Sequence, residues 1–387
     1  MVAGHLSEKS GYYYAVLSYT DSLGRHKSKW MATGYTVKGN KKRAEAFLIE
    51  ARRKYVPEEL ECAKQDILFA DFLEKWLAIA KNSIAVPTYA SYSNMVNRII
   101  CPYFRTKNIT LQKMKPGDIQ DFYQKELERV SANSVIHYHA VIHKALKYAV
   151  KIDLLDANPA DKIERPKKDK FVGSFYDADE MKTLFEVSKG TPLEIPILLG
   201  AFYGLRRSEA IGLKWAAIDF EMNTLTIRHT VTSCEVDGKR TLVASDTTKT
   251  KSSRRTLPLV QFVRERLLDL KAEQEENRRV CGKGYNREYI DYVCVNSIGN
   301  LIRPNYVTEN FKRFLQENGL REIRFHDLRH SCASMMLASG VPMKQIQEWL
   351  GHSDFSTTAN IYAHLEFSSK ISSADALLLG LNLGANP

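Results

Sequence analysis

The first sixty residues show the alternation of apolar and polar positions that is typical of short strands. Residues 12–19 are rich in aromatic side chains, a turn follows, and residues 26–33 lead the chain back, which predicts a β-hairpin. Residues 35–37 are expected to supply a third strand, and residues 41–55 have the pattern of a helix. We therefore predict a first domain over residues 1–60, built from a small β-sheet and a helix.

Residues 66–165 have a different pattern, in which apolar side chains recur every three or four positions, as on one face of a helix. The second predicted helix should stop at Pro102, and Asp118 has the position of the N-cap of the third. The predicted helices cover residues 69–80, 89–100, 118–127 and 134–150. The second domain is thus expected to be an all-α bundle over residues 66–165, followed by a charged linker at residues 165–170.

From Phe175 onward the pattern becomes a mixture of helical and strand-like segments. Strands are predicted at residues 225–229, 240–244 and 255–259, and helices at residues 177–188, 194–202, 259–275, 306–317, 326–338 and 343–350. We assign residues 172–387 to a third domain, mainly α with some β, which includes a C-terminal tail. The predicted fold class is therefore multidomain.

Composition and charge indicate the class of partner. At 387 residues the chain is long enough for two or three domains, and its formal net charge of +11 at pH 7 favours a polyanion such as DNA. The six cysteines are scattered without Cys-x-x-Cys spacing, as expected for reduced thiols. The sequence shows neither a secretory pattern at the N-terminus nor an apolar run long enough to cross a bilayer. We expect a cytoplasmic protein that does not contact a membrane.

Arg206 is the first of four cationic sites spread along the third domain. It follows Gly204 at a predicted loop-to-helix junction, where a guanidinium and the amides of a helix N-terminus can together hold a phosphate. Glu209 lies three residues later on the same helical face and could orient Arg206. Taken alone, this pair fits a surface ion pair better, and such pairs contribute little to stability.

His326 and Arg329 form a second site and are expected to share one face of a helix. His330 completes a His-x-x-x-His pattern, which raises the alternative of a zinc site. The zinc peptidase pattern needs a glutamate after its first histidine, whereas this chain has Asp327, and no third ligand is evident. Because Arg329 would also repel a metal cation, we favour phosphate binding.

The C-terminal part of the third domain carries the remaining chemistry. Gly351 is expected to end a helix and so to project His352 from a turn, and Tyr362 lies at the end of the next predicted helix. Lys249 adds a cation shortly before the last predicted strand. Phosphate-compatible residues in four separate segments, with a phenol beside them, indicate phosphoryl transfer on a nucleic-acid backbone through a covalent tyrosine intermediate.

These motifs resemble those of the tyrosine recombinase, or phage integrase, family, and the resemblance covers nearly the whole chain. Gly204-Leu205-Arg206-Arg207-Ser208-Glu209 looks like the first arginine box of the family, His326-Asp327-Leu328-Arg329-His330 like the second, and Leu350-Gly351-His352 through Tyr362 like the third. The layout is most similar to that of integrases of conjugative transposons. It implies an arm-type DNA-binding domain over residues 1–60, a core-binding domain over residues 66–165 and catalysis within residues 172–387.

The resemblance also implies a role for each of these side chains on one DNA phosphate. The phosphate would be held by Arg206, Arg329 and His352, the departing 5′ oxygen protonated by Lys249, and the nucleophile Tyr362 assisted by His326. Lys251 lies two residues after Lys249 and remains the alternative lysine. The implied reaction is site-specific recombination, the integration and excision of a mobile element through a 3′-phosphotyrosine, with no metal, ATP or other cofactor.

The implied partners are double-stranded DNA at core and arm sites, further copies of the chain in a homotetramer, and an excision accessory protein. The apolar tail at residues 371–383 is expected to dock on a neighbouring copy or on its own domain. Two other functions fit part of the sequence: a type IB topoisomerase, and a DNA-binding accessory factor without catalysis. The predicted sheet and tail oppose the first, and the complete set of site residues opposes the second. A metal hydrolase is the remotest alternative.

Overall fold

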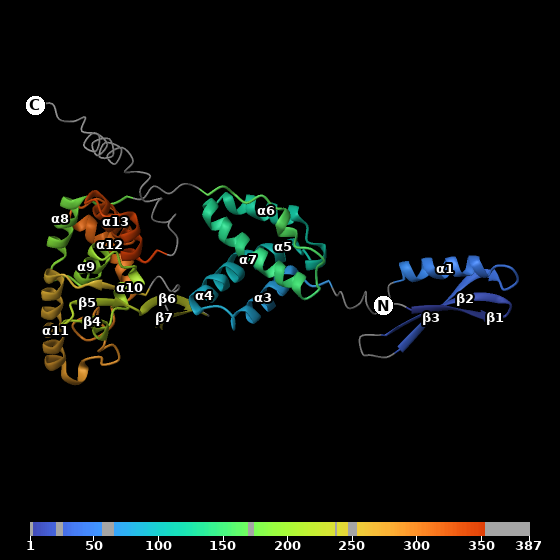
Figure 1. The fold of residues 1–387 in the computed structure, drawn as a ribbon, viewed down its shortest axis with the longest axis horizontal. Coiled ribbons are helices and arrows are strands. Elements are labelled where there is room, and N and C mark those ends of the chain that lie inside the picture. Colours follow the sequence, from blue (N-terminus) through green and yellow to red (C-terminus); the bar gives the residue numbers. More distant parts are fainter. Residues whose placement is uncertain are drawn as a thin grey trace, which may run out of the picture. The chain divides into compact units, whose positions relative to one another are not determined.

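The computed structural model describes residues 3–20, 26–55, 66–168, 174–236, 238–246 and 254–352 (Figure 1). The chain divides into two compact units near residue 169. The first unit comprises residues 1–84 and 92–169, which include the N-terminal sheet and most of the helical bundle, and the second comprises residues 85–91 and 170–387, which include the mixed α/β region. Within the described ranges, none of the helices combines the length and the apolar character needed to span a bilayer.

The N-terminal sheet is antiparallel in the order β1-β2-β3, and α1 lies along one of its faces (Figure 1). Its elements are β1 (Ala3–Lys9), β2 (Tyr12–Thr20), β3 (His26–Thr36) and α1 (Lys41–Lys54). The predicted hairpin and helix are confirmed. The third strand was predicted wrongly, because residues 35–36 extend β3 and the other partner of β2 is β1. Residues 3–9 are mostly small or polar, so their sequence carries little strand signal.

The two faces of this sheet differ. Gly4 lies so close to α1 that an added Cβ would meet side-chain atoms of Leu48 at 3.1 Å and of Arg52 at 3.2 Å. Because side chains alternate between faces, Tyr14 and Trp30 lie on the opposite face, with ring centroids 6.2 Å apart. Trp30 is 52% exposed. The face that α1 does not cover therefore presents large aromatic side chains to solvent.

The helical bundle contains α3 (Phe69–Ala80), α4 (Val86–Met95), α5 (Cys101–Lys107), α6 (Pro116–Leu127) and α7 (Ala132–Lys151). The prediction that a helix stops at Pro102 was wrong. α4 continues into α5 through one π-helical turn, η1 (Val96–Ile100), in which the Cys101 N–H bonds the Val96 carbonyl. This wider turn lets the helix pass a proline that lacks an N–H group.

The start of α6 also differs from the prediction. Lys115 occupies the N-cap position, and the Asp118 carboxylate in the first helical turn accepts the Lys115 N–H at 2.8 Å. An acidic side chain in this place satisfies an otherwise unpaired helix N–H group and complements the helix dipole. Phe104 packs against both Phe69 and Phe122, at centroid distances of 4.9 and 5.4 Å, so the aromatic stripes of the sequence form the core of the bundle.

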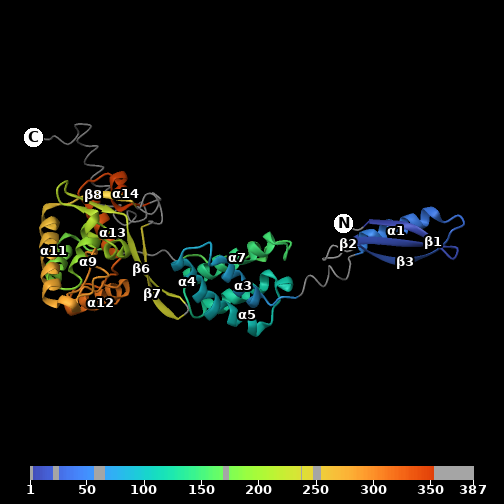
Figure 2. The same cartoon turned by 90° about the horizontal axis from the view of Figure 1, so that it is seen from below.

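The second unit has a helical core with strands along one side (Figures 1 and 2). Its helices are α8 (Ala178–Ser188), α9 (Glu194–Phe202), α10 (Arg207–Ile211), α11 (Gln261–Cys281), α12 (Pro304–Glu317), α13 (Asp327–Ala338) and α14 (Met343–Leu350). Its strands are β4 (Ile218–Asp219), β5 (Thr224–Ile227), β6 (Thr230–Val236), β7 (Lys239–Ser245) and β8 (Arg255–Pro258). One antiparallel sheet has the order β4-β5-β8, and β6 and β7 form a hairpin that projects from the unit (Figure 2).

The apolar helix α9 lies at the centre of this unit and packs against α8, α10 and α13. Its buried Glu194 is held by Arg266 of α11 through a two-bonded ion pair at 2.7 and 3.0 Å. Gly200 faces Phe325, whose ring an added Cβ would approach to 3.0 Å. The close contact between α9 and the segment before α13 brings the end of α9 next to the second motif of the sequence.

Candidate active site

Arg206 stands at the N-cap of α10, two residues after the left-handed Gly204. Its guanidinium bonds the Glu209 carboxylate at 2.6 Å and the Gly351 carbonyl at 3.3 Å, and its backbone N–H bonds the same carboxylate at 3.0 Å. The side chain remains 35% exposed. Arg206 is therefore fixed at its base while part of its guanidinium faces solvent.

Glu209 is buried and is shared between two arginines. Arg255 donates to it at 3.1 Å and donates its Nε–H to the Trp349 carbonyl at 2.6 Å. Burial alone would raise the pKa of Glu209, but the charges of Arg255 and Arg206 lower it below its ordinary value. The carboxylate therefore stays ionised and orients Arg206, so the surface-pair interpretation of this motif is wrong: Glu209 is only 2% exposed.

Arg329 is fully buried on α13 and binds the turn that follows α14. Its Nη2 donates to the Leu350 carbonyl at 2.6 Å, its Nη1 donates to the Gly204 carbonyl at 2.5 Å, and its Nε donates to His352 Nε2 at 3.2 Å. Burial, followed by the charges of Arg206 and Arg255, lowers the pKa of Arg329 to about 9. The guanidinium is therefore still charged at neutral pH.

His352 is buried beside these cations. Burial, followed by the charges of Arg329 and Arg206, lowers its pKa to about 3, so the imidazole is neutral. Since Nε2 accepts a hydrogen bond from Arg329, the ring proton lies on Nδ1. Gly351 adopts the left-handed conformation at the end of α14, and this turn places His352 next to Arg329.

His326 lies one residue before α13, where it forms the N-cap instead of the first helical turn. The residue lies at the surface, and one side of its ring is covered by the His330 ring, which it meets edge to face at a centroid distance of 5.3 Å. Partial burial and then the neighbouring His330 and Arg329 lower the pKa of His326, which favours the neutral imidazole. His330 Nδ1 is buried without a hydrogen-bond partner among the described residues.

Two aromatic rings hold the turn after α14 against β8. Tyr203 and Trp349 stack with centroids 5.9 Å apart and an interplanar angle of 15°. The Tyr203 hydroxyl donates to the Pro258 carbonyl at 3.1 Å, which ties the end of α9 to the end of β8. Gly204 has φ +62°, and an added Cβ would lie 2.3 Å from a Leu350 methyl carbon. Only glycine therefore fits between α9 and the turn.

The structure thus brings Arg206, Glu209, Arg329 and His352 together around the Leu350–His352 turn, with His326 at the start of α13. Lys249, Lys251, Tyr362 and the tail at residues 371–383 lie outside the described residues. Arg255 is a member of the cluster to which the sequence interpretation gave no role. Its only signal was its position at the start of the strand that follows residues 247–253, which carry Lys249 and Lys251 and are called the lysine segment below. The contacts of Arg255 depend on residues far away in the chain.

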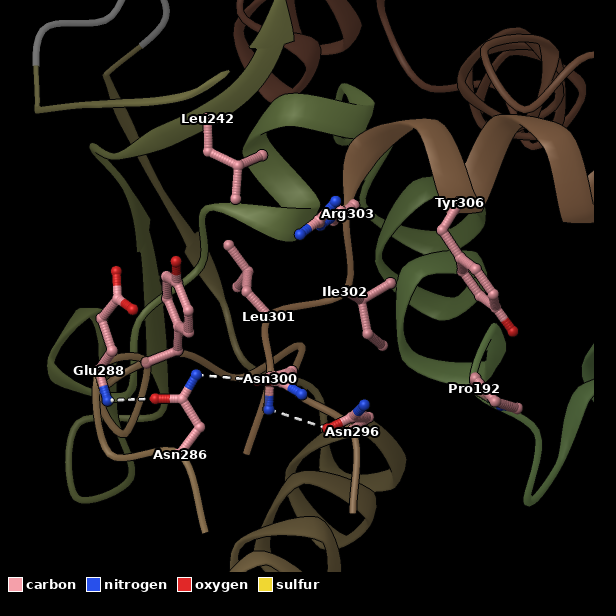
Figure 3. Close-up of a pocket in the computed structure, with 11 residues that line it drawn as sticks. Pro192, Leu242, Asn286, Glu288, Asn296, Asn300, Leu301, Ile302, Arg303 and Tyr306 are labelled. Atoms are coloured by element: carbon pink, nitrogen blue, oxygen red, sulfur yellow. Dashed lines mark hydrogen bonds between the residues drawn. The ribbon is translucent and has the colours of Figure 1, made fainter. Parts of the chain in front are cut away.

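Among the described residues, neither a metal site nor the pocket lined by other residues can be assigned to this cluster. No group of three His, Cys, Asp or Glu side chains comes together among them, and Asp327 is bound by the Arg324 guanidinium at 2.6 and 3.0 Å. A separate pocket of about 590 Å³ is lined by Leu242, Asn286, Asn300, Tyr306 and neighbouring residues (Figure 3). None of the cluster's residues lines this pocket.

Comparison with known proteins defines the class. Residues 174–369 match the phage integrase family, and residues 68–127 match the N-terminal SAM-like domain of phage integrases. The XerC-like tyrosine recombinase of Caldanaerobacter subterraneus subsp. tengcongensis is 30% identical over 332 residues, which are 81% of this chain and 83% of the relative. The ICEBs1 integrase of Bacillus subtilis is 26% identical over 87% of this chain and 89% of its own length.

Solved structures show the same fold. The Tn1549 transposon integrase in complex with a circular intermediate DNA superposes with a TM-score of 0.64 at 19% identity, over 80% of this chain and 99% of that chain. A lambda integrase dimer bound to a core site gives a TM-score of 0.56 at 16% identity, over 92% of this chain and 93% of that chain. The predicted multidomain fold is confirmed.

The chain belongs to the phage integrase family of tyrosine recombinases. It is therefore an enzyme that transfers DNA strands in site-specific recombination.

Proposed function

We propose that this recombinase integrates and excises a mobile element, and that it breaks and rejoins DNA through a bond between Tyr362 and a 3′ phosphate. The observation that carries the proposal is the charge balance of the cluster. The guanidiniums of Arg206 and Arg255 bind the carboxylate of Glu209, and the charge of the same carboxylate also acts on the buried guanidinium of Arg329, so three positive charges face one negative charge among the described residues of the cluster. The unbalanced positive charge suits a phosphodiester, whose negative charge increases as the five-coordinate transition state forms.

The donors needed to hold the phosphate are present. A guanidinium has five N–H groups, and Arg329 uses one on each of its three nitrogens for the described protein acceptors. The remaining N–H groups of Arg329 and the exposed part of Arg206 would bind the non-bridging oxygens. His352 would donate its Nδ1–H to the same phosphate.

The proton transfers would be carried out by residues on both sides of the phosphate. His326, whose lowered pKa keeps its imidazole neutral, would accept the proton of the Tyr362 hydroxyl as the P–O bond to the tyrosine forms. Lys249, or Lys251 in its place, would give a proton to the 5′ oxygen as the other P–O bond breaks. The linkage keeps the phosphodiester bond energy, so strand exchange would need neither ATP nor a metal ion.

The other regions would bind the DNA. We assign arm-site binding to residues 1–60, because the exposed face of the sheet presents Tyr14 and Trp30, and core-site binding to residues 66–165 together with the catalytic domain at 172–387. A lambda integrase tetramer bound to a Holliday junction has the same fold, with a TM-score of 0.55, which supports a tetramer here. The likeness to a transposon integrase favours an element of the conjugative-transposon type. We also propose a cytoplasmic location and an excision accessory protein.

The test uses attachment-site duplexes selected for binding from a random-sequence pool and cloned in two plasmids. The proposal predicts joint molecules that carry one half of each site, formed in the presence of EDTA. Relaxation of supercoils without joint molecules would instead identify a type IB topoisomerase. Binding without any strand cleavage would identify a non-catalytic accessory factor, and a requirement for a divalent metal would point to a metal hydrolase.

A further inference from the structure

Outside the arginine cluster, the second unit contains a hydrogen-bonded Asp–His–Tyr series, in which the histidine and the tyrosine are buried and the aspartate is exposed. His229 lies between β5 and β6 and is 7% exposed. Its Nδ1 bonds Asp246 at 2.6 Å and its Nε2 bonds the Tyr292 hydroxyl at 2.9 Å. Both ring nitrogens of a buried histidine are therefore used to join two segments that are far apart in the sequence.

The direction of the hydrogen bonds follows from the chemistry of the partners. The hydrogen bond from His229 lowers the pKa of Asp246, so this side chain is a carboxylate that only accepts, and Nδ1 carries the proton. Burial, followed by the charge of Asp246, raises the pKa of Tyr292, so its hydroxyl remains protonated and donates to Nε2. Each group in the chain has a partner of the correct kind while the imidazole is neutral.

Tyr292 is a rigid anchor for this chain. The segment around it pairs with residues 213–215, through bonds from the Val293 N–H to Leu213 at 3.0 Å and from the Trp215 N–H to Asp291 at 2.9 Å. Lys214 also lies 5.0 Å above the Tyr292 ring. Residues 213–215 follow α10 directly, so the anchor is connected to the helix that begins at Arg206.

Asparagine side chains stiffen the loop on either side of this anchor. Asn286 donates to the Asn300 side chain at 2.8 Å and accepts the Glu288 N–H at 2.9 Å, and Asn296 accepts the Asn300 N–H at 2.9 Å (Figure 3). These bonds close the loop at both ends of the segment that carries Tyr292. Tyr292, which binds His229, is therefore fixed to the core of the unit.

At the other end of the hydrogen-bonded series, Asp246 stands at the base of the lysine segment. Asp246 follows β7 directly, and Lys249 comes three positions later in the sequence. Three residues span at most about 11 Å, so fixing Asp246 confines the reach of Lys249. After the segment, the chain returns at Arg255, which is held by Glu209 and Trp349. Buried groups thus hold the chain on both sides of the lysine.

We propose that His229 and Asp246 are positioning residues that hold the base of the lysine segment in register with the arginine cluster. Their purpose is to present the Lys249 ammonium to the 5′ oxygen as the P–O5′ bond breaks and the P–O bond to Tyr362 forms. The inference rests on the proposed function, because it acts through the proton that this lysine donates. Neither residue needs to touch DNA.

The test compares two nicked duplexes that carry the attachment site and differ only in the 5′ bridging atom of the scissile phosphate, which is oxygen or sulfur. A thiolate is a good leaving group and needs no proton from the enzyme. Asp246→Ala and His229→Ala should slow single-turnover cleavage of the oxygen substrate about 10- to 100-fold. On the sulfur substrate the cleavage rates of both variants should lie within a few-fold of the rate of the unmodified protein. Equal slowing on both substrates would overturn the inference.

The fold is controlled separately. The Asp246 side chain is 82% exposed, so Asp246→Ala should keep the thermal unfolding midpoint and the DNA affinity of the unmodified protein. Asp161→Ala removes the comparable Asp–His pair of Asp161 and His143, 2.7 Å long, from the helical bundle. It should leave the ratio of the two cleavage rates unchanged. A changed ratio in Asp161→Ala would show that the loss of any such pair has this effect, and would overturn the inference.

Lysine variants separate this inference from the proposed function. Lys249→Ala and Lys251→Ala are measured on the same two substrates. If sulfur rescues neither lysine variant, the assignment of a lysine as the acid is wrong, and the positioning role falls with it. If sulfur rescues a lysine variant but not Asp246→Ala, the proposed function survives and only the positioning role is wrong.

Discussion

Arg255 on β8 and Glu209 on α10 are 46 positions apart in the sequence, yet their side chains meet at 3.1 Å in the buried interior. The same carboxylate binds Arg206 at 2.6 Å. One acid therefore fixes two guanidiniums, of which Arg255 is buried and Arg206 reaches the surface. This shared carboxylate connects the strand after the lysine segment to the first arginine motif.

Glu209→Gln is expected to destabilise the protein and to impair cleavage. The amide keeps the shape but removes the carboxylate that binds Arg206 and Arg255, so these two guanidiniums lose their counter-charge. The free energy of unfolding should fall by about 3–5 kcal/mol, and DNA cleavage should fall at least about tenfold. Chemical denaturation and single-turnover cleavage check this. The control Glu276→Gln, in an exposed pair with Arg279, should change neither. Normal cleavage by a fully stable Glu209→Gln protein would refute the role given to this carboxylate.

His352 should make the stability of the protein depend on pH. Its pKa in the folded protein, about 3, lies below the ordinary value of 6.5, so the unfolded chain takes up the proton first as the pH falls. The free energy of unfolding should therefore decrease as the pH drops below about 6.5 and continue to decrease toward the folded pKa. In His352→Gln this decrease should become shallower by up to about 1.4 kcal/mol per pH unit. Identical slopes for both proteins, measured by denaturation between pH 4 and 8, would contradict the buried neutral imidazole.

Gly204→Ala should destabilise the protein in two ways, by backbone strain and by a clash with Leu350. The methyl group would be strained at φ +62° and would also meet Leu350 at 2.3 Å. Gly190, with φ +71° and no atom within 4 Å of an added Cβ, supplies a matched control for backbone strain alone. Gly190→Ala should cost about 1–2 kcal/mol, and Gly204→Ala clearly more, with loss of cleavage. Equal thermal unfolding midpoints for the two variants would show that the turn moves away at no cost.

Trp30→Ala tests the assignment of the N-terminal sheet. The side chain is 52% exposed, so its removal should leave the fold intact and should weaken binding to arm-site duplex about tenfold. Core-site binding should not change. Met222→Ala, at a 74% exposed position in the second unit, is the control for loss of an exposed apolar side chain. Unchanged arm-site affinity in a titration of Trp30→Ala would place the arm-binding surface elsewhere.

The sequence predicted those features that depend on near neighbours. The apolar positions from Phe69 to Ala80 predicted a helix that ends before Pro87, and the structure has one over Phe69–Ala80, because the apolar period is regular there. The motifs around Arg206 and Arg329 were visible as short patterns. The end of α11 was missed by several residues, since its last turns are charged and carry no apolar period. Pro102 misled the prediction because the π turn before it depends on packing in the bundle.

The missing parts of the site are contacts between distant segments. The role of Arg255 depends on a carboxylate and a carbonyl from two other elements, and the role of His229 depends on Asp246 and Tyr292. A lone arginine or histidine in the sequence gives no sign of such partners. Glu209 was recognised as a partner of Arg206, but its burial and its second arginine could come only from the fold.

The most direct test of the account is to identify the residue that becomes joined to DNA. The protein is mixed with a nicked attachment-site duplex in EDTA, digested with a protease, and the DNA-linked peptide is sequenced by mass spectrometry. We predict that the linked peptide contains Tyr362 bonded to a 3′ phosphate, and that Tyr362→Phe forms no covalent complex. A linkage at another residue, or a covalent complex with Tyr362→Phe, would contradict the account.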